Sequence, residues 1–185
     1  MRGFLREEAL REKKGKCRVI FLDRDGVINK RMPVHCHVTS CEDLEILPDV
    51  YEALGLLDRA GYVSLVITNQ RCIALGTLDE KGLSLINDKM IRDLADHGTS
   101  VSGMYYCPHD NGDNCSCRKP QTGLFEEACR DLEAAGVTVD KEGSWMIGDE
   151  DTDIEAGKRF GVNTVKIGDD VPDLLAAVRM ITGTR

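Results

Sequence analysis

Two aspartates, two positions apart, follow the first long apolar run of the chain. The run at 17–22 ends directly at Asp23, and Asp25 and Gly26 come next. Carboxylates at positions i and i+2 can share a hard cation such as Mg²⁺ with a third carboxylate from another segment. Beside such a cation one carboxylate can attack phosphorus, while the other protonates the leaving oxygen and later activates water. The pair therefore suggests phosphoryl transfer.

Three later apolar runs also lead to polar residues. These residues are Thr68, Asn69 and Gln70 after one run, Arg118 and Lys119 beyond the next, and Asp149 with Asp153 after a third. A hydroxyl, an amide and a lysine are groups that can hold phosphoryl oxygens. In open parallel sheets, ligands bind at the carboxyl ends of the strands. We therefore expect these residues to meet at one edge of a sheet.

The elements that must position these residues alternate between strand and helix. Apolar runs predict strands at 17–22, 62–68, 101–106, 144–147 and 162–167. Helical periodicity with Pro or Gly at the ends predicts helices at 48–60, 78–97, 122–135, 153–160 and 171–181. This order indicates an α/β, Rossmann-like fold of three layers, a parallel sheet with helices on both faces. The charged residues 1–16 suggest a mobile or helical N-terminal extension to a single domain at 17–185.

Four potential zinc ligands lie within eleven residues. Cys107, His109, Cys115 and Cys117 form a Cys₃His set suited to tetrahedral Zn²⁺. Because four protein ligands leave no position for water, the metal should be structural. The alternative is a group of reduced thiols beside a chance histidine. The set leads directly into Arg118 and Lys119, so bound zinc would brace the segment that presents the lysine.

Composition limits the range of functions. The chain has 185 residues, of which 42% are hydrophobic and 30% charged, with a net charge of −8. This charge argues against nucleic acid as a partner, because phosphate-backbone affinity comes from clustered Lys and Arg. No apolar run is long enough to span a membrane and no secretory signal is present, so we expect a cytoplasmic location. A monomer is the default expectation, and most of the remaining five cysteines are expected to be small buried or half-buried residues.

The motif at 21–29, Phe-Leu-Asp-Arg-Asp-Gly-Val-Ile-Asn, resembles the first motif of the haloacid dehalogenase (HAD) superfamily. Thr68-Asn69-Gln70 resembles the second motif of this superfamily, and Lys119 resembles the third. Gly148-Asp149, together with Asp153, resembles the fourth. The resemblance covers roughly 17–168. It implies that Asp23 is the nucleophile, Asp25 the general acid and base, and that Thr68 and Lys119 stabilise the phosphoryl group. Mg²⁺ would be held by Asp23, the Asp25 backbone carbonyl and Asp149.

The segment 107–120, which we call the zinc loop, resembles that of one HAD subfamily. This subfamily contains heptose bisphosphate phosphatases and histidinol phosphatases. The implied reaction is removal of the 7-phosphate from D-glycero-D-manno-heptose 1,7-bisphosphate, a small phosphorylated metabolite. Asn69, Gln70, Arg71 and Arg118 are the predicted substrate-binding residues. Arg71 and Cys72 stand where Ser-Gly is common, and Leu75 where Arg is common. Arg71 could supply a positive charge for the distal phosphate, or it could be a solvated loop residue.

Three alternatives stay open. The short segment between His109 and Cys115 favours a histidinol-phosphate phosphatase. An open site could admit a polynucleotide 3′-phosphate, although no basic stripe supports this. A non-catalytic binding module would keep the fold without turnover. The spacings around Thr68 leave no room for a large cap domain, so loops near 30–42 and 107–118 should cover the site.

Overall fold

The computed structural model describes residues 3–33 and 36–184. A six-stranded sheet forms the middle layer, in the order β1-β5-β4-β3-β7-β8. Its strands are β1 (Gly3–Leu5), β3 (Val19–Leu22), β4 (Val63–Asn69), β5 (Gly103–Cys107), β7 (Trp145–Gly148) and β8 (Asn163–Lys166). All neighbours are parallel except β1, which runs antiparallel to β5. A separate two-stranded parallel sheet joins β2 (Gly15–Cys17) to β6 (Val137–Val139).

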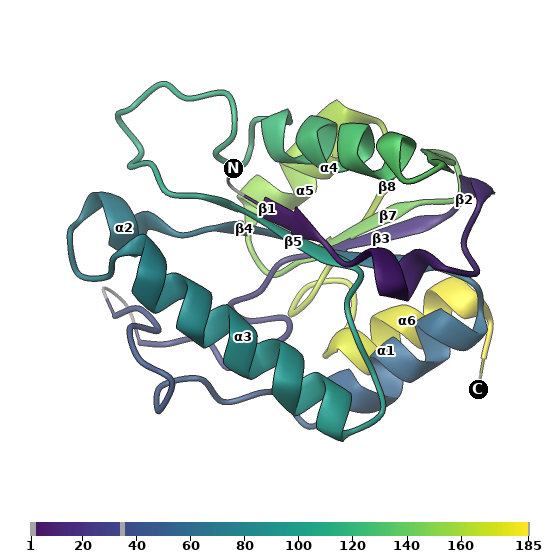
Figure 1. Cartoon of the computed structure of the whole chain (residues 1–185), viewed down its shortest axis with the longest axis horizontal. Coiled ribbons are helices and arrows are strands. Elements are labelled where there is room, and N and C mark those ends of the chain that lie inside the picture. Colours follow the sequence, from purple (N-terminus) through teal and green to yellow (C-terminus); the bar gives the residue numbers. More distant parts are fainter. Residues whose placement is uncertain (1–2, 34–35, 185) are drawn as a thin grey trace.

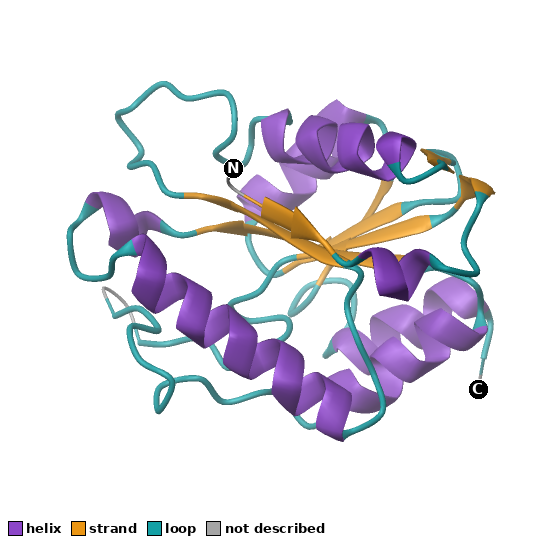
Figure 2. Ribbon diagram, in the orientation of Figure 1, coloured by secondary structure: helices purple, strands orange, loops and turns teal. Residues whose placement is uncertain are grey.

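Helices cover both faces of the large sheet, as predicted (Figures 1 and 2). One face packs against α1 (Val50–Arg59), α3 (Glu80–Asp96) and α6 (Leu174–Thr182). The opposite face packs against α4 (Gly123–Ala134) and α5 (Asp151–Phe160). Two short helices, the 3₁₀ helix η1 (Glu7–Leu10) and α2 (Arg71–Ala74), complete the described chain. The structure has the three-layer α/β fold that the alternating pattern indicated.

The central strand β3 shows why the sequence folds in this way. Its four residues are all fully buried, since each contacts one of the two helical layers. Val19 and Phe21 face α4 and α5, while Ile20 and Leu22 face the layer of α1, α3 and α6. Phe21 packs against the rings of Phe125 and Phe160. A strand buried on both faces reads as a continuous apolar run, which is the pattern of Val19–Leu22 within the predicted run at 17–22.

The position of β3 decides where the site lies. It pairs with β4 on one side and with β7 on the other. From β3 the chain moves outward through β4 and β5, and later returns to place β7 and β8 on the opposite side. Such a reversal of strand order leaves a crevice at the carboxyl ends of the strands, where ligands of open α/β sheets bind.

The N-terminal residues differ from the expectation of a mobile or helical extension. β1 adds an edge strand to the sheet, with Gly3 opposite Tyr105 of β5. A Cβ on Gly3 would lie 2.2 Å from the Tyr105 ring, so this close approach needs glycine. Leu10, at the end of η1, is buried in the layer of α4 and α5. The segment docks because the edge of β5 offers backbone groups that need partners.

Among the described helices, none is long and apolar enough to cross a membrane.

Candidate active site

A cleft of about 730 Å³ opens at the carboxyl ends of the strands. Asp23 and Lys119 line it, together with side chains from the segments 31–33, 36–38 and 110–121. These segments belong to the two loop regions that the sequence predicted as the cover of the site. Within residues 3–33 and 36–184 no further domain lies over the cleft, in agreement with the prediction that a large cap is absent.

Lys119 lies between two buried carboxylates. Its Nζ is 2.8 Å from Asp23 Oδ1 and 2.6 Å from Asp153 Oδ1. It also donates a hydrogen bond of 2.7 Å to the carbonyl oxygen of Ile67 in β4. Asp23 follows β3, whereas Asp153 lies in the first turn of α5. Three segments that are far apart in the sequence therefore meet around one ammonium group.

Burial and neighbouring charges shift the pKa values of Asp23 and Lys119. Burial raises the pKa of Asp23, Lys119 opposes the rise, and Asp153 and Asp25 add to it, so that the pKa reaches about 7. Burial lowers the pKa of Lys119, but Asp153 and Asp23 outweigh burial and leave that pKa above its ordinary value. Lys119 is therefore a permanent cation. A further cation near Asp23 would favour its ionised form, which is the nucleophilic one.

Three neighbours hold the Asp25 carboxylate. Arg24 Nη2 donates to both of its oxygens, at 2.9 and 3.0 Å. Asn29 Nδ2 and Gln70 Nε2 each donate one further hydrogen bond, at 3.0 Å. Arg24 is only 1% exposed, although its sequence position next to two aspartates gave no sign of this burial. Burial alone raises the pKa of Asp25, but Arg24, Asn29 and Gln70 together hold that pKa below its ordinary value.

Gln70 connects Asp25 to Thr68. Its Nε2 also donates to Thr68 Oγ1 at 3.0 Å, and all but 2% of the residue is buried. Cys72, which replaces a common glycine, is buried beside it with Sγ 3.6 Å from Gln70 Oε1. The amide that the sequence assigned to substrate binding thus orients two other polar side chains of the site.

Asn69 fixes the backbone of Lys119. Its Oδ1 accepts a hydrogen bond of 3.0 Å from the Lys119 amide, and its Nδ2 donates one of 3.2 Å to the Lys119 carbonyl. This reciprocal pair joins the end of β4 to the segment before α4. Asn69 lines the cleft, yet both of its polar atoms are used by the protein itself.

A carboxylate cluster beside Lys119 fits a divalent cation. Ligand oxygens of Asp23, Asp149 and Asp153 lie within 4.8 Å of one another. Asp149 Oδ1 is buried and has no hydrogen-bond partner among the described residues. Burial raises the pKa of Asp149, although Arg31 opposes the rise. Because carboxylate oxygens are the ligands that Mg²⁺ prefers, the donor set and the unpartnered oxygen both match this ion.

The predicted ligand set consisted of Asp23, the Asp25 backbone carbonyl and Asp149, and the side-chain cluster contains both of its carboxylates. The cluster adds the carboxylate of Asp153, whereas the carboxylate of Asp25 is held by Arg24, Asn29 and Gln70. The sequence already placed Asp153 with Asp149 at this edge of the sheet, and the structure shows in addition that the Asp153 carboxylate lies within the cluster.

Gly26 allows the first and fourth motifs to touch. Its φ of +89° lies in the left-handed region, and a Cβ there would lie 2.1 Å from Asp149 Oδ2. A side chain at this position would force the Asp149 carboxylate to move. The glycine of the first motif is therefore required by packing against Asp149 as well as by its own backbone conformation.

The four predicted zinc ligands converge. Cys117 Sγ lies 3.2 Å from Cys107 Sγ and 3.6 Å from Cys115 Sγ, while His109 Nδ1 lies 3.2 Å from Cys117 Sγ. A tetrahedron with Zn–S bonds of about 2.3 Å has edges of about 3.8 Å. These spacings are close to that value, so the four side chains fit one Zn²⁺ ion. Burial raises the pKa of Cys107, and a metal that takes its thiolate would offset this rise.

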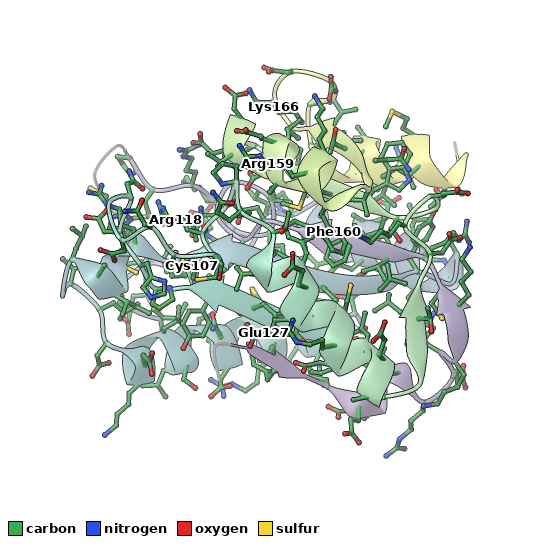
Figure 3. All side chains as sticks on the ribbon, turned by 90° about the horizontal axis from the view of Figure 1, so that it is seen from above. Cys107, Arg118, Glu127, Arg159, Phe160 and Lys166 are labelled. Atoms are coloured by element: carbon green, nitrogen blue, oxygen red, sulfur yellow. The ribbon has the colours of Figure 1, made fainter. Side chains whose placement is uncertain are left out.

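Two arginines, Arg71 and Arg118, line the cleft. Arg118 donates to Asn111 Oδ1 at 2.8 Å and to the His109 carbonyl at 3.2 Å. Arg71, at the start of α2, donates to both carboxylate oxygens of Asp110 at 2.5 and 3.3 Å. The charge of Arg71 is therefore matched by an acid, whereas the hydrogen-bond partners of Arg118 are neutral. Figure 3 shows Arg118 near Cys107 at one end of the molecule.

Comparisons with known proteins agree with this geometry. The family model described as HAD-hydrolase-like matches residues 116–177. The chain is 38% identical over 152 residues to D-glycero-beta-D-manno-heptose-1,7-bisphosphate 7-phosphatase of Vibrio cholerae, covering 78% of this chain and 77% of the relative. It is 32% identical over 150 residues to the histidine biosynthesis bifunctional protein HisB of Legionella pneumophila, covering 81% of this chain but 41% of that protein.

A solved structure extends the likeness to the whole fold. D,D-heptose 1,7-bisphosphate phosphatase from B. bronchiseptica, in complex with magnesium and phosphate, superposes with a TM-score of 0.78 at 29% identity. The match covers 91% of this chain and 99% of that one. The motifs, the fold and the share of each relative that is covered agree. The chain belongs to the HAD-like hydrolases and, within them, to the family of the D-glycero-D-manno-heptose-1,7-bisphosphate 7-phosphatases.

Proposed function

We propose that this chain is a Mg²⁺-dependent phosphatase that converts D-glycero-D-manno-heptose 1,7-bisphosphate into heptose 1-phosphate and inorganic phosphate. The observation that carries the proposal is the convergence of Asp23, Lys119, Asp149 and Asp153 in a cleft that also contains Asp25. The names of the family members support the choice of substrate.

In the first half of the reaction, a carboxylate oxygen of Asp23 attacks the 7-phosphorus. The bond between phosphorus and the sugar oxygen breaks, and Asp25 gives its proton to that oxygen. Asp25 has a lowered pKa in this structure. The phosphate dianion that arrives beside it raises this pKa, since like charges disfavour the carboxylate. The products are an aspartyl-phosphate on Asp23 and heptose 1-phosphate.

In the second half, water attacks the phosphorus of the aspartyl-phosphate. Asp25, now a carboxylate, takes the proton of that water, and Asp23 leaves as a carboxylate with release of phosphate. The hydrogen bonds from Arg24, Asn29 and Gln70 favour this ionised form of Asp25. The same residue thus acts as acid and then as base.

The transferred phosphoryl group needs cations and donors around its oxygens. Lys119 Nζ and the hydroxyl of Thr68 supply these from the protein. Mg²⁺, held by Asp23, Asp149 and the Asp25 backbone carbonyl with Asp153 beside them, would neutralise the repulsion between the Asp23 carboxylate and the phosphate. Asn69 keeps Lys119 in place through its backbone.

Zn²⁺ on Cys107, His109, Cys115 and Cys117 would have a structural role. Arg118 and Lys119 follow Cys117 directly, so a rigid zinc loop fixes one residue for each phosphate of the substrate. We assign the distal phosphate to Arg118, because its hydrogen-bond partners are neutral, so that no hydrogen-bonded carboxylate has to be displaced. Arg71 is already paired with Asp110.

Further predictions on domain, assembly and location accompany this function. We propose the single domain at 17–185 as the catalytic unit, with the preceding segment packed on it through β1 and Leu10, and the enzyme works as a monomer in the cytoplasm on a small phosphorylated metabolite. Histidinol phosphate is the second candidate substrate. It is favoured by the short segment between His109 and Cys115 and by the likeness to the bifunctional histidine enzyme, although that likeness covers 41% of the relative.

The test is phosphate release in the presence of Mg²⁺ from both anomers of heptose 1,7-bisphosphate, from histidinol phosphate and from a 3′-phosphorylated oligonucleotide. Asp23→Asn is the inactive variant, and Asp58→Asn, whose side chain is 80% exposed on α1, is the matched control. Rapid release from one heptose anomer, lost only in Asp23→Asn, supports the proposal. Preferred cleavage of histidinol phosphate would replace the substrate, and absence of any phosphoenzyme with a fluoride analogue of phosphate would refute the mechanism.

A further inference from the structure

Arg31 lies in the loop after the first motif and reaches the corner between β7 and α5. Its Nη1 donates a hydrogen bond of 2.9 Å to Asp149 Oδ2, a residue 118 positions further along the chain. Its Nη2 pairs with Glu150. One guanidinium group thus holds two successive carboxylates, and neither the motifs nor the proposed mechanism gives it a role.

The hydrogen bond from Arg31 makes the two carboxylate oxygens of Asp149 inequivalent. Oδ2 is held by Arg31, while Oδ1 is buried without a partner among residues 3–33 and 36–184. Fixing one oxygen of a carboxylate also fixes the direction of the other. Ligand carboxylates of metal sites are commonly oriented in this way by an outer hydrogen bond.

The second carboxylate extends the effect to Asp153. Glu150 is the N-cap of α5, and its backbone amide donates a hydrogen bond of 3.1 Å to Asp153 Oδ2. Asp153 Oδ1 is thereby left to face Lys119, at 2.6 Å. By holding Glu150, Arg31 steadies the first turn of the helix that carries Asp153.

For a cation at the carboxylate cluster, the positive charge of Arg31 matters less than the position of its guanidinium group. Its side chain is 57% exposed, so water screens the repulsion between its charge and a cation at the cluster. A planar guanidinium can donate to two carboxylates at once, which a lysine ammonium at the end of a flexible chain does less well.

We propose that Arg31 is a positioning residue of the cation site: it holds the β7–α5 corner so that Asp149 Oδ1 is left for a cation and Asp153 stays beside Lys119 and Asp23. The inference rests on the proposed function, since it concerns the cation that this function requires. It adds a residue outside the four motifs and links the loop that lines the cleft to the ligands of the metal.

The test measures Mn²⁺ binding to the full chain without substrate, by electron paramagnetic resonance of free Mn²⁺ and by calorimetry. Arg31→Gln should bind Mn²⁺ about 10-fold more weakly, the lower end of the effects seen when outer partners of metal ligands are removed. Arg31→Lys should recover part of this loss. Lys30→Gln is the matched control, because Lys30 is the neighbouring residue and pairs with Glu45 instead.

Unchanged Mn²⁺ affinity in Arg31→Gln overturns the inference. Tighter binding overturns it too, because Arg31 would then compete with the cation for Asp149. Circular dichroism must show that the variant is folded as the wild type is. If the wild-type chain itself does not bind Mn²⁺, the proposed function fails, and this outcome is distinct from a failure of Arg31 alone.

Discussion

The ammonium group of Lys119 lies 2.6 Å from Asp153 Oδ1, and both side chains are 1% exposed. Asp23 Oδ1 lies on the other side of the same nitrogen at 2.8 Å. Two buried carboxylates so close to one cation need that cation for stability. The group that we propose for phosphoryl binding is therefore also part of what holds β3 and α5 together.

Removal of Lys119 should affect stability as well as activity. Lys119→Met leaves the two buried carboxylates without a protein cation, and the free energy of unfolding should fall by about 3–5 kcal/mol. Phosphate release should fall by at least about 100-fold, as when a donor to a developing charge is lost. Urea unfolding and a phosphate assay measure the two effects. Lys89→Met is the control, since Lys89 pairs with Asp93 on α3 outside the site. Unchanged stability of Lys119→Met would contradict the buried pairing.

Asn69 should act through the backbone of Lys119. Asn69→Leu removes both hydrogen bonds to residue 119, while Asn69→Asp keeps the acceptor for the amide of Lys119 and loses the donor to its carbonyl. We expect kcat to fall about 10-fold or more in Asn69→Leu, because small displacements of a catalytic group are costly. The fall should be smaller in Asn69→Asp, and KM should change little in both. A rise in KM with normal kcat would instead indicate direct contact with substrate.

Zinc removal should loosen the loop before Lys119. We expect the purified chain to contain one zinc per molecule by elemental analysis. Chelation, or Cys115→Ser, should lower the melting temperature and reduce kcat, since binding energy of a structural metal contributes to folding. Cys129→Ser is a suitable control, because Cys129 lies on α4 outside the ligand set. A metal-free protein with the same melting temperature and activity would show that the four side chains are only thiols beside a histidine.

Arg118 and Arg71 should differ in their effects on substrate affinity. Arg118→Ala should raise KM for the heptose bisphosphate about 10-fold, corresponding to loss of one charge-assisted hydrogen bond. Arg71→Ala should have a smaller effect, because Asp110 already accepts both of its hydrogen bonds. Neither change should alter KM for a sugar with a single phosphate. Equal effects of the two variants would mean that Arg71 leaves Asp110 when substrate binds.

Much of the fold could be read from the sequence because its signals are local. The buried strand Val19–Leu22, within the predicted run at 17–22, is continuously apolar, and the helix after Pro48 has apolar residues at 3.6-residue spacing before it ends near Gly61. α2 and β6 were not predicted, since four and three residues are too short for a period to be visible. The N-terminal strand was also missed, because a strand of three residues depends on the edge it joins.

The sequence by itself determined which chemistry is available: Asp23, Asp25 and Lys119 for phosphoryl transfer, and three cysteines with His109 for a metal. These follow from residue type and spacing, which are properties of the chain alone. Only the tertiary structure decided how the groups are shared. In the folded chain Asp153 joins the carboxylate cluster. Hydrogen bonds pair Gln70 with Asp25, Asn69 with Lys119 and Arg31 with Asp149. The physical reason is that a hydrogen bond depends on distance and direction between segments up to 118 residues apart, and no local pattern encodes either.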